Sequence, residues 1–372
     1  MAYLTSSHAA DTSTLALFKD WAKAISDAFA AFGWVQTNDT GQVVWTATVL
    51  TFTEVQVVGA VATYLYSSYV GPAPRVGMSV IVTGFGTAGN NLNPGVLTAV
   101  SGGASGTVAM TTSTQANEVH AGSGTTTALA AAPGAGVYVY EIWGMGDALQ
   151  ATSPFYLKLE CGTIASQGGC PNIYFTIGTG VNGAGSISGN TGTRTTMKGS
   201  YAAGGGATLY ECNFCGSSDY FGMMLWRLAG TANVSVLCME RSKDSFGANT
   251  GDYLTINSAS YNANTQQTVF KVGLGTNTTL ETGTTGRWAT ILPITSATGS
   301  QNNKTHVSPV YPLVGQVTYP SIMAMVVLSA DLVEGSVFTV QIYGTNHNYL
   351  FTKSNYSAVG NQGVGWPSIR WE

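Results

Sequence analysis

The stretch that decides the fold reads Val-Tyr-Val-Tyr-Glu-Ile-Trp over residues 137–143 and Phe-Tyr-Leu-Lys-Leu-Glu-Cys over residues 155–161. Both runs are rich in aromatic and β-branched residues, and a polar, Gly-containing connector separates them. This is the pattern of two paired strands. From Phe155 to Glu160 apolar and polar-tipped residues alternate, so one face can be buried while the other meets water. We interpret this pair as the start of the main β-domain.

Downstream of this pair, short runs of β-branched and aromatic residues recur as far as Thr352, with turn-forming residues between them. Such spacing predicts a mainly β fold, built as a large antiparallel β-sandwich or a jelly-roll-like pair of sheets. Residues Gly178 to Gly206 are rich in Gly, Ser, Thr and Asn and contain few apolar residues. We expect a long loop there, either flexible or ordered by a partner.

The composition favours a folded protein rich in turns and poor in surface charge. Of the 372 residues 47 are Gly and only 9% are charged, while 44% are hydrophobic. The net charge of −4 and the scattered Lys and Arg residues argue against nucleic-acid binding. No apolar run is long enough to cross a membrane, and the first residues lack the basic start of a secretion signal. We therefore expect synthesis in a cytoplasm.

One helix is predicted from Ser13 to Phe32, where apolar residues recur at steps of three and four. A residue between Asp11 and Ser13 is expected to cap its start, and Gly33 suits the position just past its end. Trp21 widens the apolar stripe beyond one face. The helix could therefore pack on its own β-domain or against a neighbouring subunit.

The segment between the helix and the main β-domain differs from both in its sequence pattern. Residues 34–45 resemble a β-hairpin with its turn near Gly41. Short predicted strands follow up to Pro133, and a low-complexity run from Gly122 to Gly136 reads as a linker. We predict three parts: residues 1–45, which belong to the main domain; residues 46–136, an inserted small β-module with its linker; and residues 137–372, the main β-sandwich.

Local motifs of catalysis and metal binding are lacking. No nucleophile elbow, phosphate loop or dinucleotide fingerprint occurs, although a carboxylate pair separated in sequence would leave no such motif. The five cysteines include one short spacing, Cys212 to Cys215, without the second pair that a zinc site needs. Asp244 and Asp252 flank a turn that could hold calcium or form a surface hairpin. We predict buried structural thiols, no catalytic residues, no cofactor and no metal.

Aromatic residues are the remaining candidates for binding, because Tyr and Trp can stack on sugars or anchor protein interfaces. Core filling is the alternative reading of the same residues. The candidate contacts for a host glycan are Tyr64, Tyr66 and Tyr69. The candidate assembly interface comprises the helix stripe and two C-terminal tryptophans: Leu15, Phe18, Trp21, Ile25, Phe29, Trp366 and Trp371.

Several segments together resemble virion structural proteins of tailed bacteriophages, of the kind placed in the tail, the baseplate or the tail tip. The segments are Gly33-Trp34, Tyr140-Glu-Ile-Trp143 with Asp147-Ala-Leu-Gln-Ala-Thr152, Phe175-Thr-Ile-Gly-Thr-Gly180, Glu240-Arg-Ser-Lys-Asp244 and Tyr311-Pro-Leu-Val-Gly315.

The resemblance implies a non-enzymatic structural subunit that is located in the virion and assembles with copies of itself and with other virion proteins. It carries no catalytic residues with it. Two other roles are alternatives: a capsid decoration or head-fibre protein, and a receptor-binding module for host surface glycans.

Overall fold

The structure is a computed structural model. It describes residues 2–9, 14–111, 116–163, 171–189, 194–199, 209–227, 234–244, 248–260, 268–274, 277–282, 307–309, 313–314, 317–318, 324–327, 336–342, 344–351 and 366–371.

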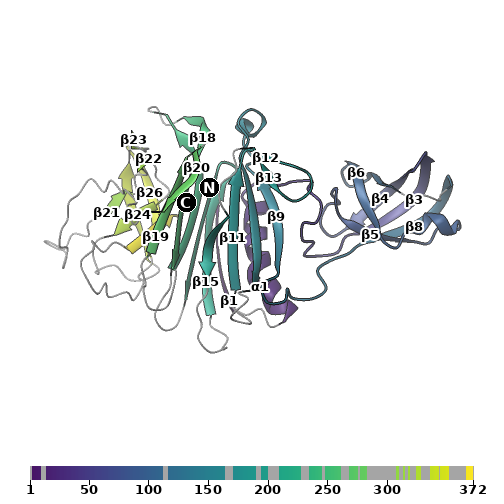
Figure 1. Cartoon of the computed structure of the whole chain (residues 1–372), viewed down its shortest axis with the longest axis horizontal. Coiled ribbons are helices and arrows are strands. Elements are labelled where there is room, and N and C mark those ends of the chain that lie inside the picture. Colours follow the sequence, from purple (N-terminus) through teal and green to yellow (C-terminus); the bar gives the residue numbers. More distant parts are fainter. Residues whose placement is uncertain are drawn as a thin grey trace.

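The fold is mainly β, as predicted, with antiparallel sheets, one α-helix and a closed barrel among the described residues (Figure 1). The predicted strand pair is present: β9 (Tyr138–Gly144) and β10 (Tyr156–Thr163) run antiparallel, with Leu157 opposite Trp143. The short 3-10 helix η2 (Ala148–Ala151) lies in the connector between them. This pair belongs to the first of the two sheets that enclose the main core.

The first sheet has the strand order β14-β11-β10-β9-β2. Its other members are β2 (Val35–Gln36), β11 (Pro171–Gly178) and β14 (Thr195–Gly199). The second sheet has the order β1-β15-β16-β17-β18-β19-β20. Its members are β1 (Ala2–Ala9), β15 (Leu209–Ser217), β16 (Tyr220–Arg227), β17 (Val234–Lys243), β18 (Asn249–Ser260), β19 (Thr268–Leu274) and β20 (Asn277–Thr282).

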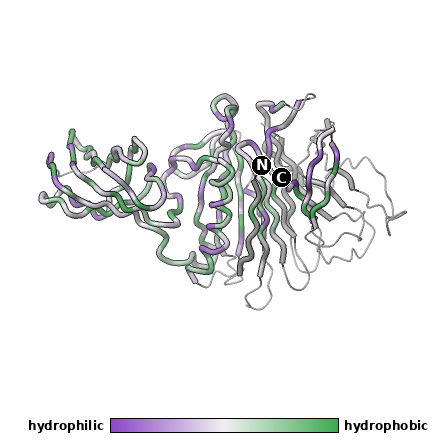
Figure 2. Tube along the Cα trace, turned by 180° about the vertical axis from the view of Figure 1, so that it is seen from behind, coloured by the Kyte–Doolittle hydropathy of each residue, from purple (hydrophilic) through white to green (hydrophobic). Residues whose placement is uncertain are grey.

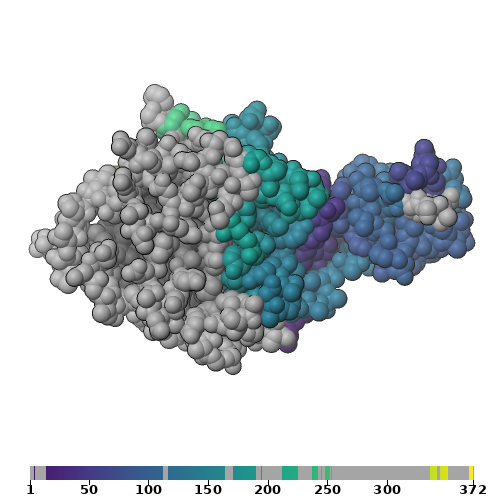
Figure 3. Space-filling model, in the orientation of Figure 1, coloured from purple at the N-terminus to yellow at the C-terminus, as the bar shows by residue number. Residues whose placement is uncertain are grey.

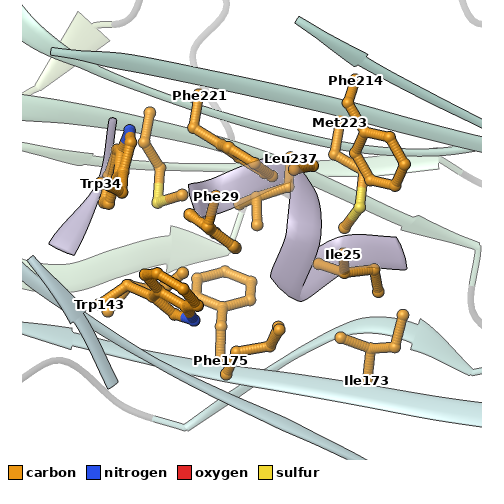
Figure 4. Close-up of a cluster of buried hydrophobic side chains, with 14 of the residues drawn as sticks. Ile25, Phe29, Trp34, Trp143, Ile173, Phe175, Phe214, Phe221, Met223 and Leu237 are labelled. Atoms are coloured by element: carbon orange, nitrogen blue, oxygen red, sulfur yellow. The ribbon is translucent and has the colours of Figure 1, made fainter. Parts of the chain in front are cut away.

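The helix α1 (Leu15–Ala31) lies between these two sheets, and its side chains fill the core that the sheets share (Figure 4). The ring of Phe29 stacks on Phe221 of β16, with centroids 3.8 Å apart, and on Trp143 of β9, with centroids 5.4 Å apart. One helix residue therefore touches both layers. Of the two alternatives for the helix, packing on its own chain is what the structure shows.

Local capping explains where α1 begins and ends. The Thr14 side chain accepts a hydrogen bond from the Leu17 N–H at 3.2 Å, whereas residues 11–13, the predicted caps, lie outside the described residues. At the other end Gly33 has a φ of +85°, and the Trp34 N–H donates to the Phe29 carbonyl at 3.0 Å. This is the Schellman arrangement, which glycine adopts without steric cost.

The prediction that residues 34–45 form a hairpin is wrong. The two ends of this segment form hydrogen bonds with β9 and do not pair with each other. Val35 in β2 pairs with Gly144, and further on the Val43 N–H donates to the Tyr140 carbonyl at 2.9 Å. Between these points the Gln42 side chain accepts from the Ile142 N–H at 2.7 Å. A side-chain amide thus takes the place of a second strand pairing.

The predicted long loop of residues 178–206 also needs a correction, since part of it is paired. Strand β12 (Gly180–Val181) pairs with β13 (Ile187–Ser188), and β14 joins the edge of the first sheet beside β11. The other small sheets are β22 (Leu313–Val314) with β23 (Val317–Thr318), and one in the order β21-β24-β27-β26-β25. Its strands are β21 (Val307–Pro309), β24 (Ala324–Val327), β25 (Val337–Ile342), β26 (Thr345–Phe351) and β27 (Trp366–Arg370).

The closed barrel is formed by the chain between β2 and β9, in the order β3-β4-β7-β6-β5-β8. It lies at the right-hand end of Figure 1 and has a hydrophobic core distinct from the main one. The 3-10 helix η1 (Ala88–Asn90) lies between β5 and β6. The strands are β3 (Val49–Val58), β4 (Val61–Val70), β5 (Ser79–Thr83), β6 (Gly95–Gly102), β7 (Gly106–Thr111) and β8 (Glu118–Thr126).

The barrel extends into the run that reads as a linker from sequence. Residues 122–126 belong to β8, so the predicted linker of residues 122–136 begins too early. A Cβ atom at Gly122 would lie 2.5 Å from the Phe85 ring, and one at Gly124 would lie 2.5 Å from the Phe52 ring. Glycine occurs at these strand positions because core rings occupy the space of a side chain.

Replacing Phe29 with Ala is expected to destabilise the main core by about 3 to 5 kcal/mol, because it removes a ring that fills space between two sheets. The exposed change Ala16→Ser is the matched control on the same helix. Urea unfolding followed by tryptophan fluorescence measures the effect on the main domain alone, since residues 46–136 contain no Trp. Equal stabilities of the two variants would contradict the enclosed position of the helix.

Candidate functional site

The junction between barrel and sandwich is built from an extended connector whose side chains point alternately into two cores. Val43 and Trp45 belong to the main core, and Val44 between them belongs to the barrel core. This is the period-2 alternation of an extended chain. The returning segment is tied to it by a hydrogen bond of 2.8 Å from the Leu129 N–H to the Val44 carbonyl. Rotation of the barrel would therefore pull a buried side chain out of one core or the other.

Close backbone packing holds the same junction from the barrel side. The Thr48 hydroxyl donates to the Pro72 carbonyl at 2.7 Å, and the Thr48 N–H donates to the Thr126 hydroxyl at 2.6 Å. Gly77 has a φ of +88°, and a Cβ atom there would lie 2.8 Å from the Cα of Thr40. A side chain at that position would push the barrel away from the connector. Figure 2 shows from behind how narrow the connection is.

A buried carboxylate, Glu141, lies at the centre of the junction and is only 3% exposed. Its Oε1 accepts from three elements: the Ser26 hydroxyl of α1 at 3.0 Å, the Gln36 amide of β2 at 3.1 Å and the Trp45 indole of the connector at 3.1 Å. These donors satisfy a polar group that would otherwise be costly to bury. Glu141 thus links the helix, the first sheet and the connector.

Burial raises the pKa of Glu141 to about 7, although the hydrogen bonds and the positive charge of Arg75 favour the ionised form. Arg75 comes from the barrel, between β4 and β5, and donates to the Val43 carbonyl at 2.8 Å. Burial raises the pKa of the Cys161 thiol well above its usual value, and the charge of Glu141 adds to this shift. Desolvation is therefore the dominant influence at the junction.

A second buried charge, Arg241, joins the two sheets of the sandwich. Its guanidinium forms a bidentate pair with Asp147, at 2.9 and 3.0 Å, and donates to the Ser153 carbonyl at 2.7 Å. Arg241 is fully buried in β17, whereas Asp147 comes from the β9–β10 connector. Two of the segments that carry the phage resemblance, residues 147–152 and 240–244, thus meet in one ion pair. Neither segment has a chemistry that reveals this from sequence.

The predicted assembly interface on the helix is wrong for four of its residues. Phe18, Trp21, Ile25 and Phe29 are at most 5% exposed and pack in the main core of their own chain. A side chain already buried between two sheets offers no surface to another subunit. Leu15 is half-buried at the start of the helix.

Of the two C-terminal tryptophans of the predicted interface, Trp366 belongs to the sheet that contains β24 to β27, and Trp371 directly follows β27. Trp366 begins β27 and pairs with Val327 of β24. Trp371 is half-buried, and its N–H donates to the Asn348 carbonyl at 2.8 Å. The backbone at both residues is held by neighbouring strands.

The predicted glycan contacts on the barrel are also corrected. Tyr64 is fully buried and Tyr66 is 3% exposed, and both belong to the barrel core. Their hydroxyls donate inside the protein, from Tyr64 to the Asn90 carbonyl at 2.8 Å and from Tyr66 to the Gly103 carbonyl at 3.0 Å. Tyr69 is half-buried against the ring of Tyr66. The alternative reading, core filling, applies to these residues.

Tyrosines on the outer face of the first sheet are covered as well. The Arg194 guanidinium lies 3.6 Å from the centroid of the Tyr174 ring, and the Lys158 ammonium lies 4.2 Å from the centroid of the Tyr140 ring. Arg194 is also paired with Glu160 at 2.8 Å. A sugar would have to displace these cations to stack on the rings.

The end of the barrel away from the junction carries a groove that the sequence did not reveal. Its volume is about 320 Å³, and Val57, Val58 and Val119 form its apolar part. The carboxylates of Glu54 and Glu118 line it too, together with two side-chain amides. In the space-filling view of Figure 3 the barrel projects from the rest of the molecule. We call it the barrel-end groove.

The predicted burial is confirmed for the four described cysteines, Cys161, Cys212, Cys215 and Cys238. Cys170 lies outside the described residues. Within the described ranges, no three His, Cys, Asp or Glu side chains gather as a metal site would require. No α-helix in the described part of the chain combines the length and apolar character needed to cross a membrane.

Comparison with known proteins identified no relative of this chain. No family model, curated protein or solved structure matches the chain.

Glu141 makes the stability of the main domain depend on pH. Because its pKa is raised from 4.5 to about 7 on folding, the stability tied to its protonation is present below pH 4.5 and is lost as the pH rises through 7. The shift corresponds to about 3 kcal/mol. Glu141→Gln, which keeps an acceptor oxygen but cannot ionise, should therefore gain stability relative to the wild type between pH 5 and pH 8.

The measurement is urea unfolding across this pH range, followed by tryptophan fluorescence. Asp27→Asn is the control, since Asp27 is exposed and pairs with Lys23 on the surface of α1. A constant stability difference between wild type and Glu141→Gln from pH 5 to pH 8 would show that Glu141 does not titrate in this way.

Proposed function

We propose that this chain is a non-enzymatic structural subunit of a tailed-phage virion, most simply of the tail, baseplate or tail-tip assembly. In this proposal the sandwich assembles with copies of itself and with other virion proteins, and the barrel is displayed outward. No cofactor or nucleic acid takes part. The sequence resemblance supports the class of protein, and the junction supports the division of labour between the two parts.

The observation that carries the proposal is the connector of residues 43–45, with its side chains alternating between two cores. An interdomain linker that permits free motion is usually exposed and polar. Here the connector is apolar, buried and hydrogen-bonded, and Arg75 of the barrel donates to its Val43 carbonyl. Such a joint suits a part that must hold a fixed direction within an assembly.

The low charge of the chain agrees with this role. Large sheet faces with few charged residues can meet other subunits with little cost of desolvating charge. Two deeply buried charged residues of the described chain, Arg241 and Glu141, are satisfied within the chain. Assembly would therefore need no rearrangement of these two groups.

Immunogold electron microscopy of virions from the phage that encodes the chain tests the proposal. An antibody raised against the folded chain and selected for binding to the barrel should label the tail end at regular positions, because the barrel is displayed. Label on the head would favour the decoration or head-fibre alternative. Intact virions that contain none of this protein by mass spectrometry would refute a virion role.

A further inference from the structure

The barrel concentrates its few charged groups in two places. Residues 46–136 contain three charged residues, Glu54, Arg75 and Glu118. Arg75 lies at the junction, where it donates to the Val43 carbonyl. Both carboxylates line the barrel-end groove, at the other end of β3. A strand of ten residues spans about 30 Å, so the two sites lie far apart.

The same groove is flanked by the most exposed large hydrophobic residues of the described chain. Val119 is 83% exposed and Val58 is 81% exposed, more than any other large hydrophobic side chain in the described ranges. Single exposed apolar residues are ordinary on protein surfaces. Here two exposed valines lie beside one groove, which is also lined by both carboxylates of the barrel. This combination of apolar and acidic groups is typical of a contact site.

The backbone around the groove is already satisfied, which argues against the addition of a strand. Pairing between β3 and β8 ends at Val55 and Glu118. Beyond this point the Val57 N–H donates to the Asn117 side chain at 2.7 Å. The Asn117 amide thus occupies the place where a partner strand would form a hydrogen bond. The groove is therefore suited to a side chain from a partner.

The carboxylates of Glu54 and Glu118 differ in the hydrogen bonds that they accept within the barrel. Glu118 accepts from the Gly86 N–H at 2.6 Å and from the Thr87 N–H at 3.0 Å, so it holds the chain between β5 and η1. Glu54 accepts from the Gln56 side-chain amide at 2.7 Å, two residues along the same strand. Both carboxylates line the groove, and no Lys or Arg does.

We propose that the barrel-end groove binds a lysine or arginine side chain presented by a partner protein. The aliphatic stem of such a residue would pack on Val58 and Val119, while its cation would lie near Glu54 and Glu118. The volume of about 320 Å³ is at the lower end for ligand pockets and suits one long side chain. The inference rests on the proposed function, since it names the partner chemistry of the displayed barrel.

Methyl NMR on the full chain with labelled valines tests this inference. The probe is a Thr-Val-Lys-Val-Thr peptide with blocked ends, and the comparison peptide has norleucine in place of Lys. We expect saturable shifts of the Val57, Val58 and Val119 methyl signals with the lysine peptide and weaker binding of the norleucine peptide. Glu54→Gln should weaken binding of the lysine peptide by about two- to fivefold, the range of an exposed ion pair.

The matched control is Val70→Ser, because Val70 is 76% exposed on the same barrel but does not line the groove. This variant should bind the lysine peptide like the wild type. Equal affinity for the two peptides, or no shift at millimolar concentration, would overturn the inference. Neither result would bear on whether the protein is located in virions, because immunogold labelling tests that separately. The groove proposal can therefore fail while the proposed virion role stands.

Discussion

The enclosure of α1 between two sheets is the constraint on which the rest of the structure depends. A helix with apolar residues on more than one side needs apolar partners on more than one side. Phe29 meets this need by stacking on Trp143 in one sheet and on Phe221 in the other. The same helix brings Ser26 to Glu141, and its Phe18 contacts Trp45 with ring centroids 5.9 Å apart. The helix therefore also fixes the connector that leads to the barrel.

From the connector onward, the direction of the barrel follows from burial. Val43 and Trp45 cannot leave the main core, and Val44 cannot leave the barrel core, without exposing apolar surface to water. Hydrogen bonds from the Trp45 indole to Glu141 and from Arg75 to the Val43 carbonyl hold the connector where the two parts meet. A small module attached in this way gains a fixed direction from the stability of the larger domain.

Sequence patterns predicted the features that depend on local periodicity. The helix and the strand pair of residues 137–161 follow from spacing alone, and so does the mainly β class. The partners of these elements could not be predicted, because most strands of the second sheet, including the one that carries Phe221 against Phe29, come from residues far along the chain. The spacing of two residues between Tyr64 and Tyr66 correctly placed both on the same face of a strand. It could not show whether that face is buried or exposed. Val58 and Val119, which flank the barrel-end groove, are too distant in sequence for any local pattern to join them.

The central claim is that the barrel is held in one direction relative to the sandwich. Distance measurement by electron spin resonance tests it most directly, with spin labels at Asp27→Cys on α1 and Val96→Cys on the barrel, both exposed positions. Single-label variants would measure any labelling of native cysteines. We predict one narrow distance distribution that broadens when Val44→Asp removes the apolar contact with the barrel core. A broad distribution in the otherwise unaltered chain would contradict the account.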